Sequence, residues 1–123
     1  MEWHFDDNMP IYTQLVYQIK FAIVSGELSP GERMAGVRDL AADAGVNPNT
    51  MQRAITQLET LGLVTTNRTL GRTVTENAGA LEEMRRRLAV ECTENFFKEM
   101  GALGYSRGEA ADMAQAEREK NDE

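Results

Sequence analysis

The chain has 123 residues and a formal net charge of −7, so its length fits one compact domain with an appendage, and its charge argues at first sight against nucleic acid. Its one cysteine, Cys92, excludes an intramolecular disulfide and a cysteine-based metal site, as suits a reducing cytosol. No stretch approaches the roughly 18 apolar residues of a membrane helix, and the acidic N-terminus is unlike a signal peptide, so we expect a cytoplasmic protein without membrane, metal or cofactor.

The first elements are a short N-terminal arm and a helix. Trp3 and Phe5 alternate along the arm, so both are expected to face one apolar surface while His4 faces outward. A helix is predicted from Pro10 to about residue 25, because its apolar residues recur with the 3.6-residue period, and Gly26 is expected to end it. These apolar positions are Ile11, Leu15, Ile19, Ala22 and Ile23.

Two further helices, at residues 37–44 and 48–61, are separated by a very short turn. Gly45 fits the left-handed position just past a last helical turn. Asn47 is a strong N-cap residue, and Pro48 fits the first helical position, where its missing N–H costs nothing. Because two helices with so short a hinge cannot be coaxial, this stretch predicts a DNA-binding helix-turn-helix.

The longer of these two helices has one apolar and one polar face. The apolar face, expected to be buried, carries Met51, Ala54, Ile55, Leu58 and Leu61. The polar face carries Asn49, Thr50, Gln52, Arg53, Thr56 and Gln57. Amide, hydroxyl and guanidinium groups are those that read base edges, and no acidic residue precedes Glu59 on this helix. Residues 33–75 hold five arginines and three acidic residues, so a mildly basic region within the acidic chain is expected to meet DNA through few phosphate contacts.

A β-hairpin is predicted next. Residues 63–66 and 73–75 are rich in β-branched side chains, and the segment between them contains turn-forming residues. A hairpin after a helix-turn-helix is a wing, and Arg68 and Arg72 near its tip suit phosphate or minor-groove contact. The alternative is a solvated hairpin whose arginines only keep the chain soluble.

From Asn77 onward the sequence predicts a long amphipathic helix. Its apolar residues follow at spacings of three and four and are Leu81, Met84, Leu88, Cys92, Phe96, Met100 and Leu103. Such a stripe is too large for a lone surface helix, so it predicts a dimer interface. The alternative is that the stripe packs on the winged domain of its own chain.

A second C-terminal helix is predicted because Ser106 and Glu109 have the spacing of a capping box. The expected fold is therefore mainly α with a small β-hairpin. It comprises a winged helix-turn-helix DNA-binding domain at residues 1–76, followed by a two-helix dimerisation segment at residues 77–123.

The run from Pro10 to Val74 resembles the DNA-binding domain of the GntR family of bacterial regulators. The motifs that carry the resemblance are Pro10-Ile11-Tyr12 with Gln14, Ile23 with Gly26, Leu28, Pro30-Gly31, Val37-Arg38-Asp39-Leu40-Ala41, Val46-Asn47-Pro48-Asn49-Thr50, Ala54, Leu58-Glu59 and Gly62-Leu63-Val64. The Pro-Ile-Tyr opening, the Asn-Pro-Asn-Thr cap and the short C-terminal region are similar to the YtrA subfamily. That subfamily pairs a winged helix with two dimerisation helices, and the resemblance implies repression of an operon that encodes an ABC transporter.

The resemblance also implies which residues contact DNA. Carried over by position, they are Arg38, Asn47, Asn49, Thr50, Gln52, Arg68 and Gly71. Arg53 is added from the helical face and Arg72 from the wing. Two departures from the family pattern stand out. Gly36 lacks the serine hydroxyl that usually caps the short helix, and the wing has lost one glycine and gained an arginine.

The sequence thus predicts a homodimeric, sequence-specific repressor whose partners are a pseudo-palindromic double-stranded DNA operator and a second copy of the chain. The alternative is a winged-helix module for protein interaction that does not bind DNA. An enzyme is excluded, because the chain has one histidine and one cysteine and no glycine-rich phosphate loop. A small-molecule effector stays unknown. It could sit at the dimer interface near Phe96 and Phe97, which otherwise serve as core.

Overall fold

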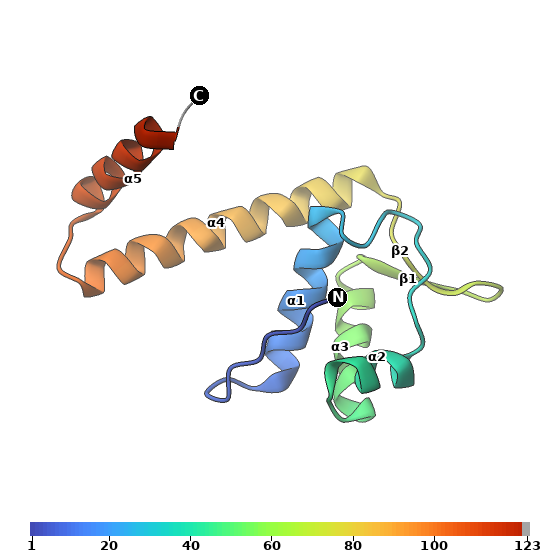
Figure 1. The fold of residues 1–123 in the computed structure, drawn as a ribbon. Helices are drawn as coiled ribbons and strands as arrows, with labels where there is room; N and C mark the ends of the chain where they lie inside the picture. Colours follow the sequence, from blue (N-terminus) through green and yellow to red (C-terminus); the bar gives the residue numbers. More distant parts are fainter. Residues whose placement is uncertain (122–123) are drawn as a thin grey trace. The chain divides into compact units, whose positions relative to one another are not determined.

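Figure 1 shows the fold of the computed structural model, which describes residues 1–121. The elements are α1 (Ile11–Ser25), α2 (Val37–Ala44), α3 (Pro48–Thr60), β1 (Val64–Asn67), β2 (Gly71–Val74), α4 (Ala78–Ala102) and α5 (Arg107–Asn121). These described elements confirm the predicted mainly α fold with a small β-hairpin. The chain forms two compact units, residues 1–85 and residues 86 onward, and α4 runs from the first into the second. The functional division at residues 76 and 77 stays a prediction.

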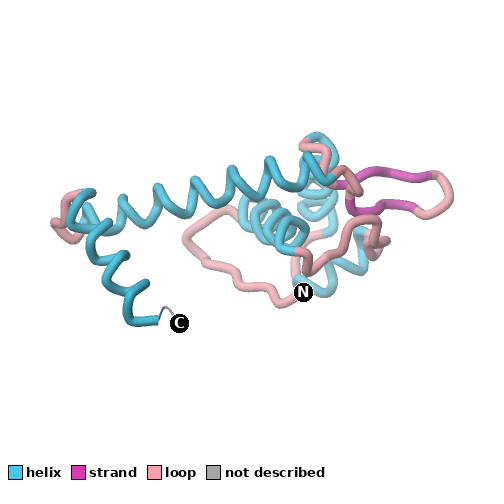
Figure 2. The backbone as a smooth tube through the Cα atoms, turned by 90° about the horizontal axis from the view of Figure 1, so that it is seen from above, coloured by secondary structure: helices cyan, strands magenta, loops and turns pink. Residues whose placement is uncertain are grey.

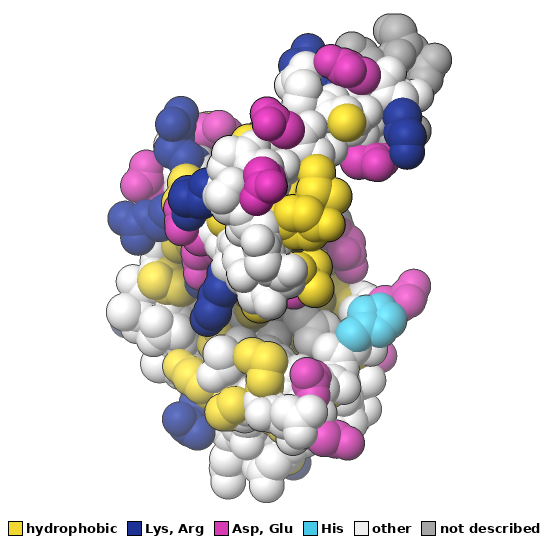
Figure 3. Space-filling view, turned by 90° about the vertical axis from the view of Figure 1, so that its left-hand side faces the viewer, with side chains coloured by type: hydrophobic (Ala, Val, Ile, Leu, Met, Phe, Trp, Pro, Cys, Tyr) yellow, Lys and Arg dark blue, Asp and Glu magenta, His cyan; other side chains and the backbone are white. Residues whose placement is uncertain are grey.

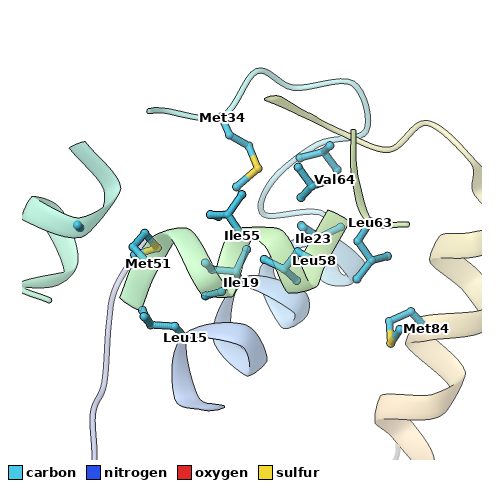
Figure 4. Packing of buried hydrophobic residues seen from close by; sticks show 13 residues of the cluster. Leu15, Ile19, Ile23, Met34, Met51, Ile55, Leu58, Leu63, Val64 and Met84 are labelled. Carbon is cyan, nitrogen blue, oxygen red and sulfur yellow. The ribbon is translucent and has the colours of Figure 1, made fainter. Parts of the chain in front are cut away.

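The core of the first unit lies where α1, α2, α3 and the hairpin meet (Figure 4). On α3 the predicted apolar face is confirmed. Four of its five residues, Met51, Ala54, Ile55 and Leu58, have no exposed surface, and Leu61 is half-buried. Burial of each large apolar side chain contributes roughly 1.5–3 kcal/mol. The opposite face of α3 is thereby held toward solvent.

The hairpin differs from the prediction by one or two residues at each strand. β1 and β2 pair antiparallel from Val64↔Val74 out to Asn67↔Gly71. The Asn67 side-chain oxygen accepts from the backbone N–H groups of Thr69 (2.8 Å) and Leu70 (3.1 Å), and Gly71 has φ +79°. A three-residue loop that is followed by a left-handed glycine continues the pairing to its tip, which residue propensity alone did not reveal.

A segment before α2 adds a further pairing to the wing. The carbonyl of Val74 accepts from Gly31 N–H, and Val74 N–H donates to the carbonyl of Glu32, both at 2.9 Å. Met34 N–H donates to the carbonyl of Arg72, also at 2.9 Å. β2 is therefore bonded on both sides, and the base of the wing is part of the folded domain. Figure 2 shows the paired strands extending from the helices of this unit.

Two glutamines of α1 fasten the N-terminal arm. Gln18 accepts from the backbone N–H of His4 (3.1 Å) and donates to the carbonyl of the same residue (2.7 Å). Gln14 likewise accepts from the backbone N–H of Asp6 (2.7 Å) and donates to the carbonyl of Asp6 (2.8 Å). It also donates to the carbonyl of Met9. Each side-chain amide pairs with the arm as a neighbouring strand would, so the arm is held in one register along the helix.

The side chains of the arm face as predicted. Trp3 and Phe5 pack against the core, with stacked rings whose centroids lie 6.0 Å apart. The side chain of His4 is 82% exposed and is visible at the surface in Figure 3. Trp3 Nε1 also donates to Asp43 Oδ2 at 2.8 Å. Because Asp43 belongs to α2, this bond ties the arm to the helix-turn-helix.

The second unit is a helical hairpin formed by the later part of α4 and by α5. The capping box at its turn is confirmed. Ser106 N–H donates to Glu109 Oε1 at 2.9 Å, and Glu109 N–H donates to Ser106 Oγ at 3.1 Å. Arg107 of α5 connects the two helices. Its Nη2 lies 3.6 Å from Glu94 Oε1, and its guanidinium carbon lies 4.2 Å from the ring centroid of Phe97.

Candidate nucleic-acid interface

The turn between α2 and α3 has the predicted caps. Gly45 is left-handed, with φ +72°, and its N–H meets carbonyls of the last turn of α2. The Asn47 side-chain oxygen accepts from Asn49 N–H at 2.7 Å, and Pro48 occupies the first helical position. The beginning of α3 is therefore set locally, by residues adjacent in the chain. The side-chain oxygen of Asn47, a predicted DNA contact, is already used in capping.

We expect Asn47→Ala to lower the free energy of unfolding by about 1 kcal/mol, because an amide donor of α3 loses its acceptor. The midpoint of urea denaturation measures this change. Asn49→Ala is the matched control. Its side chain is exposed and its backbone N–H is unchanged, and alanine favours the helix interior. Equal destabilisation by both variants would contradict the capping role.

The polar face of α3 is where the predicted reading residues gather. Asn49, Gln52 and Arg53 are exposed, and Thr50 is half-buried. Gln52 Nε2 donates to Thr56 Oγ1 at 3.2 Å. These groups supply donors and acceptors without a negative charge, as contact with base edges requires.

Arg53 is the cation on this face, and its position is set by an aromatic ring. Its guanidinium carbon lies 4.5 Å from the ring centroid of Tyr12 on α1. Stacking over the ring orients the guanidinium and leaves its N–H donors at the edge of the plane. The pattern of apolar residues could not reveal this contact, because Tyr12 lies on another helix.

Arg38 lies at the beginning of α2 and is exposed. Gly36 caps this helix without a side-chain hydrogen bond, so the backbone N–H groups of the first turn are available to an acceptor. Among the described residues no carboxylate forms an ion pair with Arg38. A cation beside a helix N-terminus is suited to a phosphate.

The wing separates its two arginines. Arg68 lies in the exposed loop and forms no ion pair with a described residue. Arg72 turns back toward α3, where its Nε lies 3.5 Å from Glu59 Oε1. Gly71 is exposed at the last pair of the hairpin. The two arginines that sequence reasoning treated alike therefore have different surroundings.

The predicted dimer residues also divide. Met84 is buried in the core of the first unit and Leu81 packs against it, which is the arrangement that the alternative, packing on the chain's own winged domain, predicts. Leu88 is buried as well. Of the other four, Phe96 and Met100 are half-buried, and Cys92 and Leu103 are exposed.

Sequence reasoning missed two residues that organise this interface. Glu59 joins α3 to the wing, and Asp43 joins α2 to the arm. Their partners are 13 and 40 residues away in the chain, and no local pattern links positions so far apart.

Elsewhere in the described part of the chain, no helix is long and apolar enough to cross a membrane. No group of three His, Cys, Asp or Glu residues in the same part could hold a metal ion.

Comparison with known proteins agrees with this geometry. The family of bacterial regulatory proteins called gntR matches residues 11–74, which span α1 to β2. The HTH-type transcriptional regulator YhcF of Bacillus subtilis is 38% identical over 109 residues, which cover 89% of this chain and 90% of YhcF. The HTH-type transcriptional repressor YtrA of the same organism is 39% identical over 71 residues, 58% of this chain and 55% of YtrA.

A solved structure extends the likeness to the fold. A GntR family transcriptional regulator from Listeria monocytogenes has a TM-score of 0.80 at 37% identity, and the match covers 91% of this chain and 98% of that one. These relatives are transcriptional regulators, which confirms that the chain is not an enzyme. Because the family's region coincides with the winged helix-turn-helix and the likeness to YhcF covers 89% of the chain, the chain belongs to the GntR family of DNA-binding transcriptional regulators.

Proposed function

We propose that the protein is a homodimeric repressor that binds a pseudo-palindromic operator. The observation that carries this proposal is the exposed face of α3, where Asn49, Gln52 and Arg53 stand together without a carboxylate. An α-helix fits the major groove, where these side chains would read base edges, with Thr50 beside them.

Phosphate contacts would set the register of the protein on the duplex. Arg38 supplies one from the beginning of α2, and the side-chain N–H groups of Asn47 supply another. Arg68 supplies a third from the wing, where Gly71 lets the backbone approach DNA closely. Because these cations are few and the chain is acidic overall, affinity would depend on correct placement more than on bulk charge.

The second unit supports dimerisation. Its two helices fully bury few apolar side chains, whereas Val90, Leu103 and Met113 are 56%, 74% and 45% exposed. A groove of about 530 Å³ between α4 and α5 is bordered by Cys92, Phe96, Phe97, Ala111 and Ala114, among others. A two-helix unit with so small an apolar interior needs a further surface to cover it. A twofold mate would provide that surface and place two α3 helices about one DNA turn apart.

The biological role is proposed by similarity. YtrA carries the name of a repressor, and the resemblance to the YtrA subfamily implies a transporter operon as the target. We infer that the present protein represses an operon of that kind, with an ABC transporter among its products. A regulator of a bacterial chromosome acts in the cytoplasm.

Fluorescence anisotropy with the DNA upstream of the protein's own operon tests the proposal. We expect specific binding that weakens steeply between about 50 and 200 mM salt, because phosphate contacts release counterions. A scrambled fragment of the same length and composition is the control. Failure to bind any upstream fragment at low salt would instead favour the protein-interaction module. The overall charge of −7 is consistent with that alternative.

A further inference from the structure

The two faces of the wing have different tasks. Val64 and Val74 are register partners with side chains in the core. Two residues further out, Thr66 and Arg72 are partners on the same face, because side chains alternate along a strand. The inner face of the wing therefore changes from apolar to polar while it still points toward α3.

The polar part of this face meets Glu59 in the last turn of α3. Thr66 Oγ1 donates to Glu59 Oε2, and Arg72 Nε lies 3.5 Å from Glu59 Oε1. Each carboxylate oxygen is thus engaged by a different strand of the hairpin. The Arg72 and Glu59 side chains are 30% and 28% exposed, so both are partly shielded from water.

The outer part of the wing has few other means of support. A two-stranded ribbon twists readily and is marginally stable alone. On its opposite face, Thr65 Oγ1 and Thr73 Oγ1 lie 3.1 Å apart, and the Asn67 side chain bonds within the loop. Those contacts join strand to strand or loop to loop, and the backbone bond from Met34 N–H to the Arg72 carbonyl joins β2 to the segment before α2. The contact with Glu59 joins the outer wing to the helix that faces DNA.

We propose that Arg72 is a positioning residue that acts through Glu59, and that this carboxylate, Thr66 and Arg72 together form a clamp between the wing and α3. The clamp sets the angle at which Arg68 reaches the DNA backbone. The wing would then contribute one phosphate contact per protomer, from Arg68, and Arg72 would contribute none. This inference rests on the proposed DNA-binding function.

A competing account predicts the opposite sign. If Arg72 is a phosphate contact that Glu59 only masks, removal of the carboxylate would release it. Operator affinity would then rise, and its dependence on salt would become steeper. Under the clamp, removal of Glu59 lowers affinity because the wing loses its direction, while the number of phosphate contacts stays the same.

The test compares Glu59→Ala, Arg72→Ala and the double variant with Arg68→Ala as the matched control. Operator affinity is measured by fluorescence anisotropy at several salt concentrations. We expect Glu59→Ala and Arg72→Ala each to weaken binding by roughly tenfold, since two wings lose a partly exposed ion pair. For both variants, the slope of the logarithm of affinity against the logarithm of salt concentration should stay at the wild-type value. The double variant should bind the operator no more weakly than either single variant. Arg68→Ala should instead lower the slope by about 0.9 per protomer.

A second measurement does not involve DNA. Backbone ¹⁵N relaxation of the free protein should show lower order parameters for the wing amides, residues 66–72, in Glu59→Ala than in the wild type. Amides of α1 serve as the internal reference.

Three results would overturn the clamp. They are a rise in affinity for Glu59→Ala, a slope for Arg72→Ala that falls as for Arg68→Ala, and unchanged wing order parameters. If the wild-type protein binds no operator, the proposed function fails, and the relaxation comparison still decides whether the clamp exists.

Discussion

Phe96→Asp is expected to convert the protein from a dimer to a monomer and to lower operator affinity by on the order of a hundredfold. Phe96 is half-buried and borders the groove between α4 and α5. Its ring meets the ring of Phe97 edge-on, with the two ring centroids 5.2 Å apart. A carboxylate at this position would have to lose its water in the proposed interface, which costs several kcal/mol. A monomer also carries one reading helix, so the contribution of the second half-site disappears.

Sedimentation velocity measures the association state, and anisotropy on the same samples measures operator binding. Lys98→Asp is the matched control, because it introduces the same side chain at an exposed position of α4. Circular dichroism establishes whether the helices persist in both variants. If Phe96→Asp still sediments as a dimer with full operator affinity, the surface that joins the two copies lies elsewhere.

The second large effect is expected for Arg38→Ala. Operator affinity should fall by roughly tenfold to a hundredfold, because the two Arg38 side chains of a dimer would each make a charge-assisted hydrogen bond to phosphate. The salt slope should fall by about 2, close to 0.9 for each phosphate that is no longer neutralised. Folding should be unaffected, since the Arg38 side chain is exposed and pairs with no carboxylate among the described residues.

Two comparison variants separate this role from others. Lys98→Ala removes the same charge from α4 and should leave the slope nearly unchanged. Gln52→Ala removes a neutral side chain from the polar face of α3. It should reduce the ratio of affinities for the operator and for a mutated site, while the salt dependence of binding stays the same. An unchanged affinity for Arg38→Ala would remove this residue from the proposed phosphate contacts.

Local signals in the sequence were enough to predict the helix-turn-helix. Asn47 and Pro48 act within the first turn of α3, and Gly45 closes α2. The pair Ser106 and Glu109 likewise caps α5 across three residues. Caps and helical periodicity are decided by neighbours within about four residues, so a single chain contains the information. The ends of the strands were predicted less accurately, because Asn67 and Gly71 act through the conformation of the loop.

The tertiary structure alone decided what each periodic or charged residue meets. Met84 and Leu103 lie on the same predicted stripe, yet Met84 is buried in the first unit and Leu103 is 74% exposed. Arg68 and Arg72 belong to one wing, yet Arg72 faces Glu59. Periodicity shows that a side chain lies on an apolar or polar face, but the partner of that face comes from a distant part of the chain. The sequence by itself thus determined the elements, the caps and the polar face of α3, and only the packing of those elements determined which residues hold that face and its wing in place.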